Sequence, residues 1–231
     1  MGGAGRRKGG GPVRTALMDE AYEALLSLIL DEGLAPGTAL RIDTIAREWN
    51  VSATPLREAL AKLEHTGLVH RIPLKGYTVA PMLTDEEFAQ LMAARLLIEP
   101  YNARHACDRD AAGTTRLLQE WHTRMTQAAA QRDNDDFRAY LQADSAFHDV
   151  IAKKCGNRFL CDAIDPLGAH VQRFRRFHGT RVTDTDVALA EHQAILDAFA
   201  AGDPERCEAA MRAHLRGVAD RAAPTSSAPA E

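Results

Sequence analysis

The clearest pattern of apolar and polar positions lies about a quarter of the way along the chain. Leu56, Leu60 and Leu63 recur at the spacing of one helix face, with polar residues between them. Ser52 precedes this stripe and is a favourable N-cap residue, because its hydroxyl can accept a hydrogen bond from the first turn. Gly67 follows it and is typical of a helix end. The pattern therefore predicts a short helix that buries one face and is exposed at its start.

The exposed start of this helix carries Ser52, Thr54 and Arg57. These residues suit a recognition helix, whose first turn reaches bases and phosphates in the major groove. A capped surface helix with ordinary solvated charges fits the segment equally well when it is taken alone. The neighbouring segments are needed to choose between the two interpretations.

The neighbouring segments favour the recognition helix. Two helices are predicted before it and a β-hairpin after it, at residues 14–32, 43–51, 68–72 and 77–79. The turn of the hairpin contains Lys75 and Gly76, which place a basic group at its tip. Helix, turn, capped helix and hairpin together predict a winged helix-turn-helix, a DNA-binding domain, over residues 13–81.

After residue 81 the pattern is helical throughout, with no strand signal. Thr84 and Glu87 form a capping-box pair that opens this region, which we expect to be an all-α domain over residues 84–221. The fold class is therefore mainly α, a winged helix-turn-helix followed by a helical bundle. The basic tail at residues 1–12 and the Ala/Pro/Ser-rich tail at residues 222–231 are predicted to be disordered. Six helices are expected in the bundle: 84–106, 113–131, 134–154, 157–178, 184–201 and 204–221.

Four polar residues fall on the apolar faces of three bundle helices. Asp144 and His148 are four residues apart and share the inward face of one helix, and His192 and His214 lie on the inward faces of the last two. Buried polar groups need partners. One interpretation is that the histidines are hydrogen-bonded core residues. The other is that the four side chains meet and bind a divalent metal, as inward side chains on facing helices do in other bundles.

Arg95 is a further inward charge, on the first helix of the bundle. A buried arginine can bind a carboxylate ligand through two parallel hydrogen bonds. It can equally form an ion pair within its own helix with Glu99, four residues on. The sequence pattern alone leaves both roles open.

The predicted recognition helix and wing carry a family resemblance. The motifs are Ser-x-Thr-Pro-Leu-Arg-Glu-Ala-Leu at 52–60, Leu-Glu at 63–64, Gly-Leu-Val at 67–69 and Lys-Gly-Tyr at 75–77. They closely resemble the DNA-binding domain of GntR-superfamily bacterial regulators, and the all-α region extends the match to the FadR-type branch, which carries an FCD domain. The resemblance implies a cytoplasmic transcriptional regulator that acts as a homodimer on a pseudo-palindromic operator in double-stranded DNA. It also implies that residues 84–221 bind an effector and form the dimer.

The resemblance also assigns site residues. The DNA contacts that it implies come from the helix start and the wing: Ser52, Thr54, Arg57, Lys75 and Gly76. Family members often carry arginine directly after the capping serine, where it reads guanine, whereas this chain has Ala53. The operator sequence is therefore not carried over, and base recognition shifts to Arg57, the wing or other groups.

The metal-binding pattern of many FCD domains matches the four inward polar residues, so the resemblance implies that Asp144, His148, His192 and His214 are metal ligands. Imidazole and carboxylate ligands suit zinc, which we favour, and also nickel, manganese or iron. The resemblance further implies that Arg95 presents its guanidinium to a small organic acid.

Composition changes this picture little. The net charge of -4 does not indicate a nucleic-acid-binding protein, so the case for DNA depends on where the positive charges lie. The sequence has neither an apolar run near the roughly 20 residues of a membrane span nor the apolar core of a signal peptide, so we expect a cytoplasmic protein without membrane contact. The four cysteines form no CxxC pair and are expected to be reduced.

Two other functions fit parts of the sequence. His148-Asp149 is the dipeptide of HD-type phosphohydrolases, which are also all-α and metal-dependent, but the remaining spacings do not fit that family. We therefore expect no enzymatic activity. A DNA-binding architectural protein without a ligand would leave the inward polar cluster without a role other than hydrogen bonding within the core.

Overall fold

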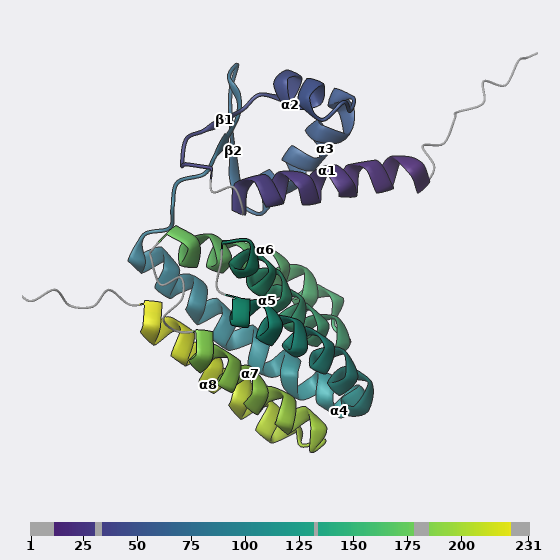
Figure 1. Cartoon of the computed structure of the whole chain (residues 1–231), viewed down its shortest axis with the longest axis vertical. Coiled ribbons are helices and arrows are strands. Elements are labelled where there is room, and N and C mark those ends of the chain that lie inside the picture. The colour runs from purple at the N-terminus through teal and green to yellow at the C-terminus, as the bar shows by residue number, and fades with distance from the viewer. Residues whose placement is uncertain (1–11, 31–33, 132–133, 178–184, 223–231) are drawn as a thin grey trace, which may run out of the picture. The chain divides into compact units, whose positions relative to one another are not determined.

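A computed structural model describes residues 12–30, 34–131, 134–177 and 185–222 of the chain (Figure 1). The chain divides into two compact units, one before and one after the Pro81–Met82 bond. The N-terminal unit combines helices with a small sheet, and the described part of the C-terminal unit is entirely helical. This confirms the predicted fold class.

The N-terminal unit is a winged helix-turn-helix. In its three-stranded antiparallel sheet β3 lies between β1 and β2, and Val69 pairs with Val79 in the hairpin. Leu56, Leu60 and Leu63 are fully buried, as their helical spacing predicts. The elements in chain order are α1 (Pro12–Leu30), β1 (Ala39–Leu40), α2 (Ile42–Glu48), α3 (Ala53–His65), β2 (Val69–Ile72) and β3 (Gly76–Val79).

The turn between β2 and β3 forms the tip of the wing. The Lys75 amide donates to the Ile72 carbonyl at 3.1 Å, and Leu74 has a positive φ of 64°, as the third residue of a type II turn requires. Gly76 follows with a φ of 90°, a backbone conformation that favours glycine. These angles turn the chain sharply and leave Lys75 exposed at the tip.

The C-terminal unit is a bundle organised around one long helix. Each of the other four helices packs against α4, which spans 47 residues. Despite this length, no helix in the described ranges is apolar enough over a sufficient stretch to cross a membrane. The five helices are α4 (Asp85–Gln131), α5 (Asn134–Lys154), α6 (Arg158–Phe177), α7 (Thr185–Ala200) and α8 (Pro204–Ala222).

A single residue interrupts α4. The sequence predicts a gap over residues 107–112, but the backbone leaves the helical region only at Asp110, with φ -161° and ψ 69°. Its carboxylate caps the helical segment that follows, because Oδ1 accepts the Gly113 amide at 2.9 Å. Lys154 of α5 donates to Oδ2 at 2.9 Å. The two expected helices therefore form one kinked element.

The predicted helix caps had different outcomes. The capping box of Thr84 and Glu87 is confirmed, with both reciprocal hydrogen bonds present at 2.8 and 3.2 Å. Ser52 occupies the N-cap position of α3, but its hydroxyl makes no capping hydrogen bond, so that detail of the prediction is wrong. Pro12 and Ala222 belong to α1 and α8; the rest of the two predicted tails lies outside the described residues.

Leu60→Ala should destabilise the N-terminal unit by roughly 2–5 kcal/mol, because Leu60 is fully buried and its truncation leaves a cavity in the core. The chain has two tryptophans, Trp49 in the N-terminal unit and Trp121 in α4, so a Trp121→Phe background lets Trp49 fluorescence report on this unit alone during urea unfolding. Leu17→Ala is the matched control, since Leu17 is 46% exposed and should cost less than about 0.5 kcal/mol. Equal costs for the two variants would contradict the core assignment.

Candidate functional site

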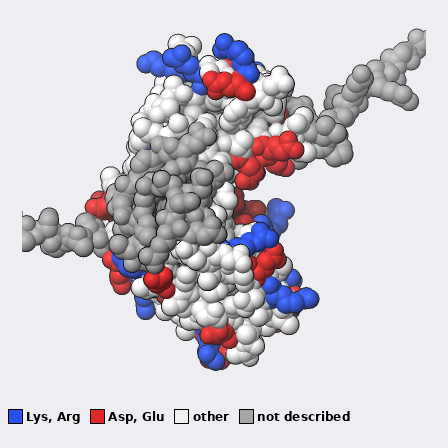
Figure 2. Space-filling model, viewed as in Figure 1, with Lys and Arg blue, Asp and Glu red and all other residues white. Residues whose placement is uncertain are grey.

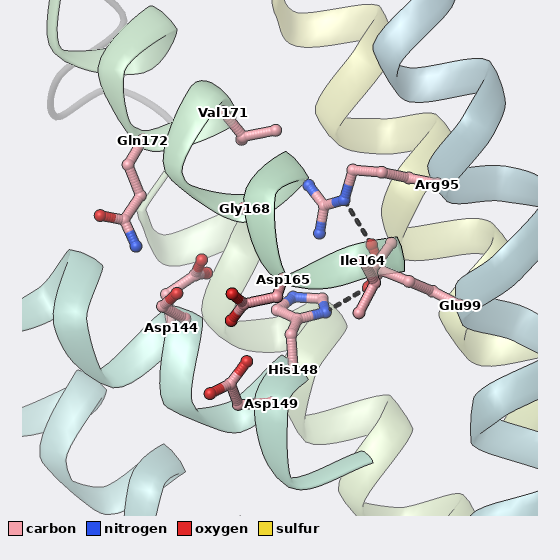
Figure 3. Close-up of a pocket in the computed structure, with 11 residues that line it drawn as sticks. Arg95, Glu99, Asp144, His148, Asp149, Ile164, Asp165, Gly168, Val171 and Gln172 are labelled. Atoms are coloured by element: carbon pink, nitrogen blue, oxygen red, sulfur yellow. Dashed lines mark hydrogen bonds and ion pairs between the residues drawn. The ribbon is translucent and has the colours of Figure 1, made fainter. Parts of the chain in front are cut away.

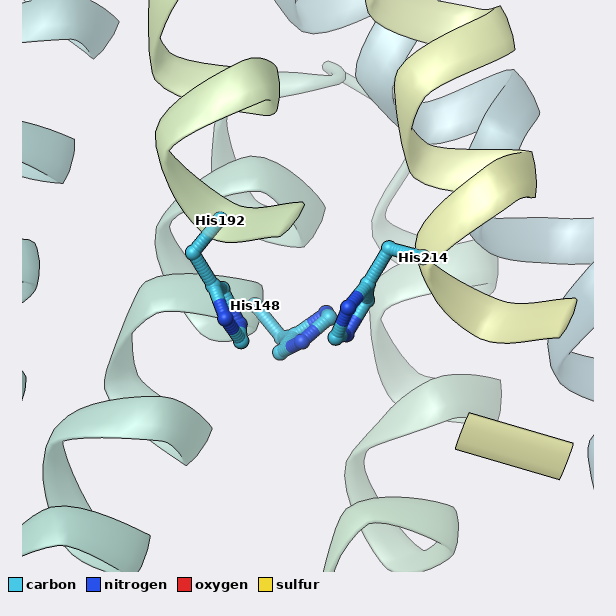
Figure 4. A group of neighbouring side chains, drawn as sticks. All are labelled: His148, His192 and His214. Atoms are coloured by element: carbon cyan, nitrogen blue, oxygen red, sulfur yellow. The ribbon is translucent and has the colours of Figure 1, made fainter. Parts of the chain in front are cut away.

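Three histidines from three helices meet inside the C-terminal unit. His148 of α5, His192 of α7 and His214 of α8 each bring one ring nitrogen into a group whose members lie within 4.8 Å of one another (Figure 4). The ring centroids of His192 and His214 are 4.4 Å apart, and both residues are almost fully buried, at 0% and 2% exposure. The bundle therefore brings together three inward histidines that are 66 residues apart at most in the sequence.

The Nδ1 atom of each ring is already engaged. It donates to Glu99 Oε2 at 2.6 Å in His148, to the Ala188 carbonyl at 2.7 Å in His192, and to Glu191 Oε2 at 2.9 Å in His214. A carbonyl or an ionised carboxylate can only accept, so the proton of each neutral ring is on Nδ1 and the lone pair on Nε2.

The Nε2 atoms are the groups left for a ligand. Nε2 of His148 and Nε2 of His192 are buried and have no hydrogen-bond partner among the described residues. Converging ring nitrogens with carboxylate or carbonyl oxygens behind the rings form the usual environment of metal-binding histidines. This arrangement is chemically suited to a divalent metal.

Asp144 lies at one side of this histidine cluster. Its Oδ1 is 3.4 Å from His192 Nε2, and its side chain is 14% exposed. It stands one helical turn before His148 on α5, as the spacing predicts, but it is outside the group of three nitrogens that lie within 4.8 Å. The structure thus places the fourth candidate ligand beside one of the three histidines.

Burial and hydrogen bonding set the charges around the cluster. Burial is the main reason why the pKa of His192 lies well below its usual value, and it also lowers the pKa of His214. Burial alone would raise the pKa of Glu191, but hydrogen bonds from His214 and Arg221 outweigh it and lower that pKa to about 2. Burial of Glu99 is likewise outweighed by Arg95 and His148, which hold its pKa well below the usual range. The rings of His192 and His214 are therefore neutral and the carboxylates charged.

Arg95 forms the intrahelical pair that was one of its two predicted roles. It is buried, and its Nε donates to Glu99 Oε1. The two terminal nitrogens of its guanidinium are turned toward the same space as the His148 ring (Figure 3). Pairing with Glu99 through Nε therefore leaves the other edge of Arg95 available to a ligand.

This space is a small cavity that adjoins the histidine cluster. Its volume is about 30 Å³, enough for one or two water molecules. α6 supplies one wall with Ile164, Asp165, Gly168, Val171 and Gln172, and the opposite wall carries Arg95 and Glu99 of α4 together with residues of α5. The α5 residues are Asp144, Ser145, His148 and Asp149.

Three residues that hold the site were not predicted as part of it. Glu99 was considered only as a partner of Arg95, and its inward position four residues after Arg95 was the available signal. Glu191 directly precedes His192, so it does not share the inward face by helical periodicity. Arg221 donates to both oxygens of Glu191 at 2.6 and 2.8 Å, a contact across 30 residues that no local pattern indicates.

The five predicted DNA-binding residues are all exposed, and they are divided between the start of α3 and the wing. Ser52, Thr54 and Arg57 are exposed at the start of α3, and Lys75 and Gly76 are exposed in the wing. Figure 2 shows lysine and arginine side chains at the end of the N-terminal unit that carries the wing. The missing cap hydrogen bond of Ser52 leaves its hydroxyl available to an external acceptor.

Comparison with known proteins identifies both units. Residues 17–79 match the family of bacterial regulatory proteins, gntR family, and residues 90–217 match the FCD domain. The HTH-type transcriptional repressor RspR of Escherichia coli (strain K12) is 28% identical over 201 residues, which cover 87% of this chain and 86% of that protein. The uncharacterized HTH-type transcriptional regulator BphR of Paraburkholderia xenovorans (strain LB400) is 27% identical over 203 residues, covering 87% and 82%.

Solved structures show the same fold. The chain is similar to E. coli McbR/YncC with a TM-score of 0.74 and 19% identity, over 87% of this chain and 94% of that one. A putative transcriptional regulator GntR from Rhodococcus sp. RHA1 gives a TM-score of 0.69 and 19% identity, over 92% and 100%. The chain therefore belongs to the GntR family of bacterial regulatory proteins, with a C-terminal FCD domain, and is a DNA-binding transcriptional regulator rather than an enzyme.

Proposed function

We propose that this regulator binds a divalent metal through Asp144, His148, His192 and His214, and that a small carboxylate bound beside the metal changes its affinity for operator DNA. The observation that carries the proposal is the histidine cluster. Each ring is fixed through Nδ1, and the nitrogens left over converge in the interior. Buried polar atoms without partners are costly, and a bound cation would remove that cost.

The residues present fit a metal of the zinc type. Three neutral imidazoles and one carboxylate are common ligands of zinc, and nickel, manganese and iron also accept them. The carboxylates that hold Nδ1 of His148 and His214 would raise the basicity of these rings toward a cation. A bound metal would supply an electropositive position at which an anionic effector can be held.

Arg95 and the cavity support a small carboxylate as the effector. The free edge of the Arg95 guanidinium faces the cavity that His148 also lines, so one carboxylate can contact the arginine and the metal together. A volume of about 30 Å³ is too small for an organic acid, so the residues that line the cavity must move when the effector binds. Such a change provides the differential affinity on which a population shift depends.

The DNA-binding half of the proposal assigns phosphate contacts to Ser52, Thr54, Lys75 and the Gly76 backbone, and a base or phosphate contact to Arg57. The exposure of all five residues supports this role. A homodimer acting in the cytoplasm would place two recognition helices on a pseudo-palindromic operator. Repression is the proposed mode of action, because the relative RspR is a repressor.

The phosphohydrolase alternative has no support from the site. Asp149, the second residue of the His-Asp dipeptide, pairs with Lys153 at 3.0 Å on α5 and is not part of the histidine cluster. The family consists of regulators. A ligand-responsive regulator therefore accounts for both units of the chain.

His148→Ala and His192→Ala should each remove most of the bound metal, because each deletes a converging nitrogen. Metal at about 100 times its dissociation constant should stabilise the wild type by roughly 2.7 kcal/mol, and the variants should lose this gain. Elemental analysis and thermal melting with and without Zn²⁺ measure both effects. His65→Ala in the exposed end of α3 is the control. Unchanged metal content in both variants would contradict the metal site.

The metal-stripped protein should lose stability as the pH falls from 7.5 to 5.5. In the unfolded chain His192 and His214 bind protons near pH 6.5, whereas burial lowers their pKa in the folded chain. The unfolded state therefore binds more protons below that pH, and the free energy of unfolding falls by up to about 1.4 kcal/mol per pH unit for each histidine. Urea unfolding followed by Trp121 fluorescence in a Trp49→Phe background measures the slope. A His192→Gln variant with the wild-type slope would contradict this origin.

Arg57→Ala should weaken operator binding by roughly tenfold to a hundredfold, the cost of about 1–3 kcal/mol for losing one arginine contact. Fluorescence anisotropy on the DNA upstream of the protein's own gene, at fixed salt, measures the change. Arg124→Ala removes an exposed arginine from α4 in the other unit and should have little effect. If Arg57→Ala binds as tightly as Arg124→Ala, the recognition role belongs to another residue.

A further inference from the structure

Gly217 of α8 faces the carboxylate of Glu191 on α7. A Cβ atom at this position would lie 2.3 Å from Glu191 Oε1 and 2.7 Å from Arg221 Nη1, well inside van der Waals contact. Glycine within a helix is less stable than alanine by roughly 0.5–1 kcal/mol. The glycine thus makes α8 locally less stable, and the space it leaves is filled by the Glu191 side chain.

Both oxygens of Glu191 are held on the α8 side. Oε2 accepts His214 Nδ1 at 2.9 Å, and Arg221 donates to Oε1 and Oε2 at 2.6 and 2.8 Å. Two parallel hydrogen bonds from one guanidinium fix the plane of a carboxylate. The orientation of Glu191, and through it that of the His214 ring, is therefore set by contacts between α7 and α8.

The same order of groups occurs at His148. There Arg95 holds Glu99, and Glu99 accepts His148 Nδ1 at 2.6 Å. In both cases an arginine balances the charge of the glutamate that orients a ring. The difference is that Arg95 and Glu99 belong to one helix, whereas the Arg221–Glu191–His214 series joins two helices and needs the space at Gly217.

We propose that Glu191 is a positioning residue of the metal site, fixed by Arg221 and admitted by Gly217, and that this arrangement raises metal affinity by holding His214 Nε2 toward the ion. The proposal rests on the metal site proposed above. It assigns a role to three residues that do not touch the metal. Loss of such an outer contact typically lowers metal affinity by about 10–100-fold.

Gly217→Ala tests the proposal because its two effects have opposite signs. Alanine favours the metal-free helix by roughly 0.5–1 kcal/mol, which offsets the hydrogen bonds that Glu191 loses, so the stability of the metal-free protein should change little. The displaced Glu191 should nevertheless lower the affinity for Zn²⁺ by about 10–100-fold. Competition with a chromophoric chelator measures affinity, and melting of the metal-free protein measures stability. In Co²⁺-loaded protein the visible absorption bands should also change, because the direction of one imidazole changes.

A double-mutant cycle with Glu191→Ala separates positioning from general packing damage. Once the carboxylate is removed, the methyl group at residue 217 can displace only the Arg221 guanidinium, which then has no Glu191 carboxylate to hold. The double variant should therefore bind Zn²⁺ no more weakly than Glu191→Ala alone. Glu191→Gln keeps the shape of the side chain and one acceptor oxygen, so it should lose less affinity for Zn²⁺ than Glu191→Ala. This comparison replaces the Gly217→Ala test if that variant does not fold.

The outcomes distinguish this inference from the proposed function. Wild-type affinity in Gly217→Ala, or losses that multiply in the double variant, would overturn the positioning role while leaving the metal site intact. In the absence of a folded Gly217→Ala variant, equal affinity of Glu191→Gln, Glu191→Ala and the wild type would overturn it. A wild-type protein that binds neither Zn²⁺ nor Co²⁺ would reject the metal site and this inference with it.

Discussion

The bundle holds three imidazole rings in its interior. The Nδ1 atom of each ring is hydrogen-bonded to a glutamate or a backbone carbonyl, and one nitrogen of each ring converges with those of the other two. This constraint organises the C-terminal unit, because each ring comes from a different helix and each is fixed through Nδ1 by a different group. His148 is oriented by Glu99 of α4, His192 by a backbone carbonyl of its own helix α7, and His214 by Glu191 of α7. Packing these helices around apolar side chains would cost less free energy than burying polar nitrogen atoms that have no hydrogen-bond partner. The arrangement supports the proposed metal site, in which a cation shared by the three nitrogens would remove this cost.

Arg95 connects the proposed metal site to the proposed effector cavity. Its Nε holds Glu99, Glu99 holds His148, and its terminal nitrogens face the cavity. An acid that binds the guanidinium would change the same series of contacts that orients a metal ligand. Metal and effector binding should thus be thermodynamically coupled, and the coupling should act in both directions. The lining of the cavity must move for an organic acid to enter, because its volume is about 30 Å³.

Periodicity predicted what lies on one helix face and could not predict what crosses between helices. Leu56, Leu60 and Leu63 are buried because their spacing matches one face of α3, and the same argument placed Asp144 and His148 inward. Periodicity did not indicate the roles of Glu191 and Gly217, because these roles depend on the packing of α7 against α8. The extent of the break in α4 was also missed. A capping aspartate confines it to one residue, a detail that helical spacing does not contain.

The most direct test of the central claim is a thermal-shift measurement on metal-stripped protein with small mono-, di- and tricarboxylates, sugar acids and amino acids. Each would be tested with and without Zn²⁺, Ni²⁺ or Mn²⁺. The account predicts that metal alone raises the melting temperature and that at least one acid raises it further only when metal is present. No shift with any metal or acid would contradict it and return the three histidines to a purely structural role.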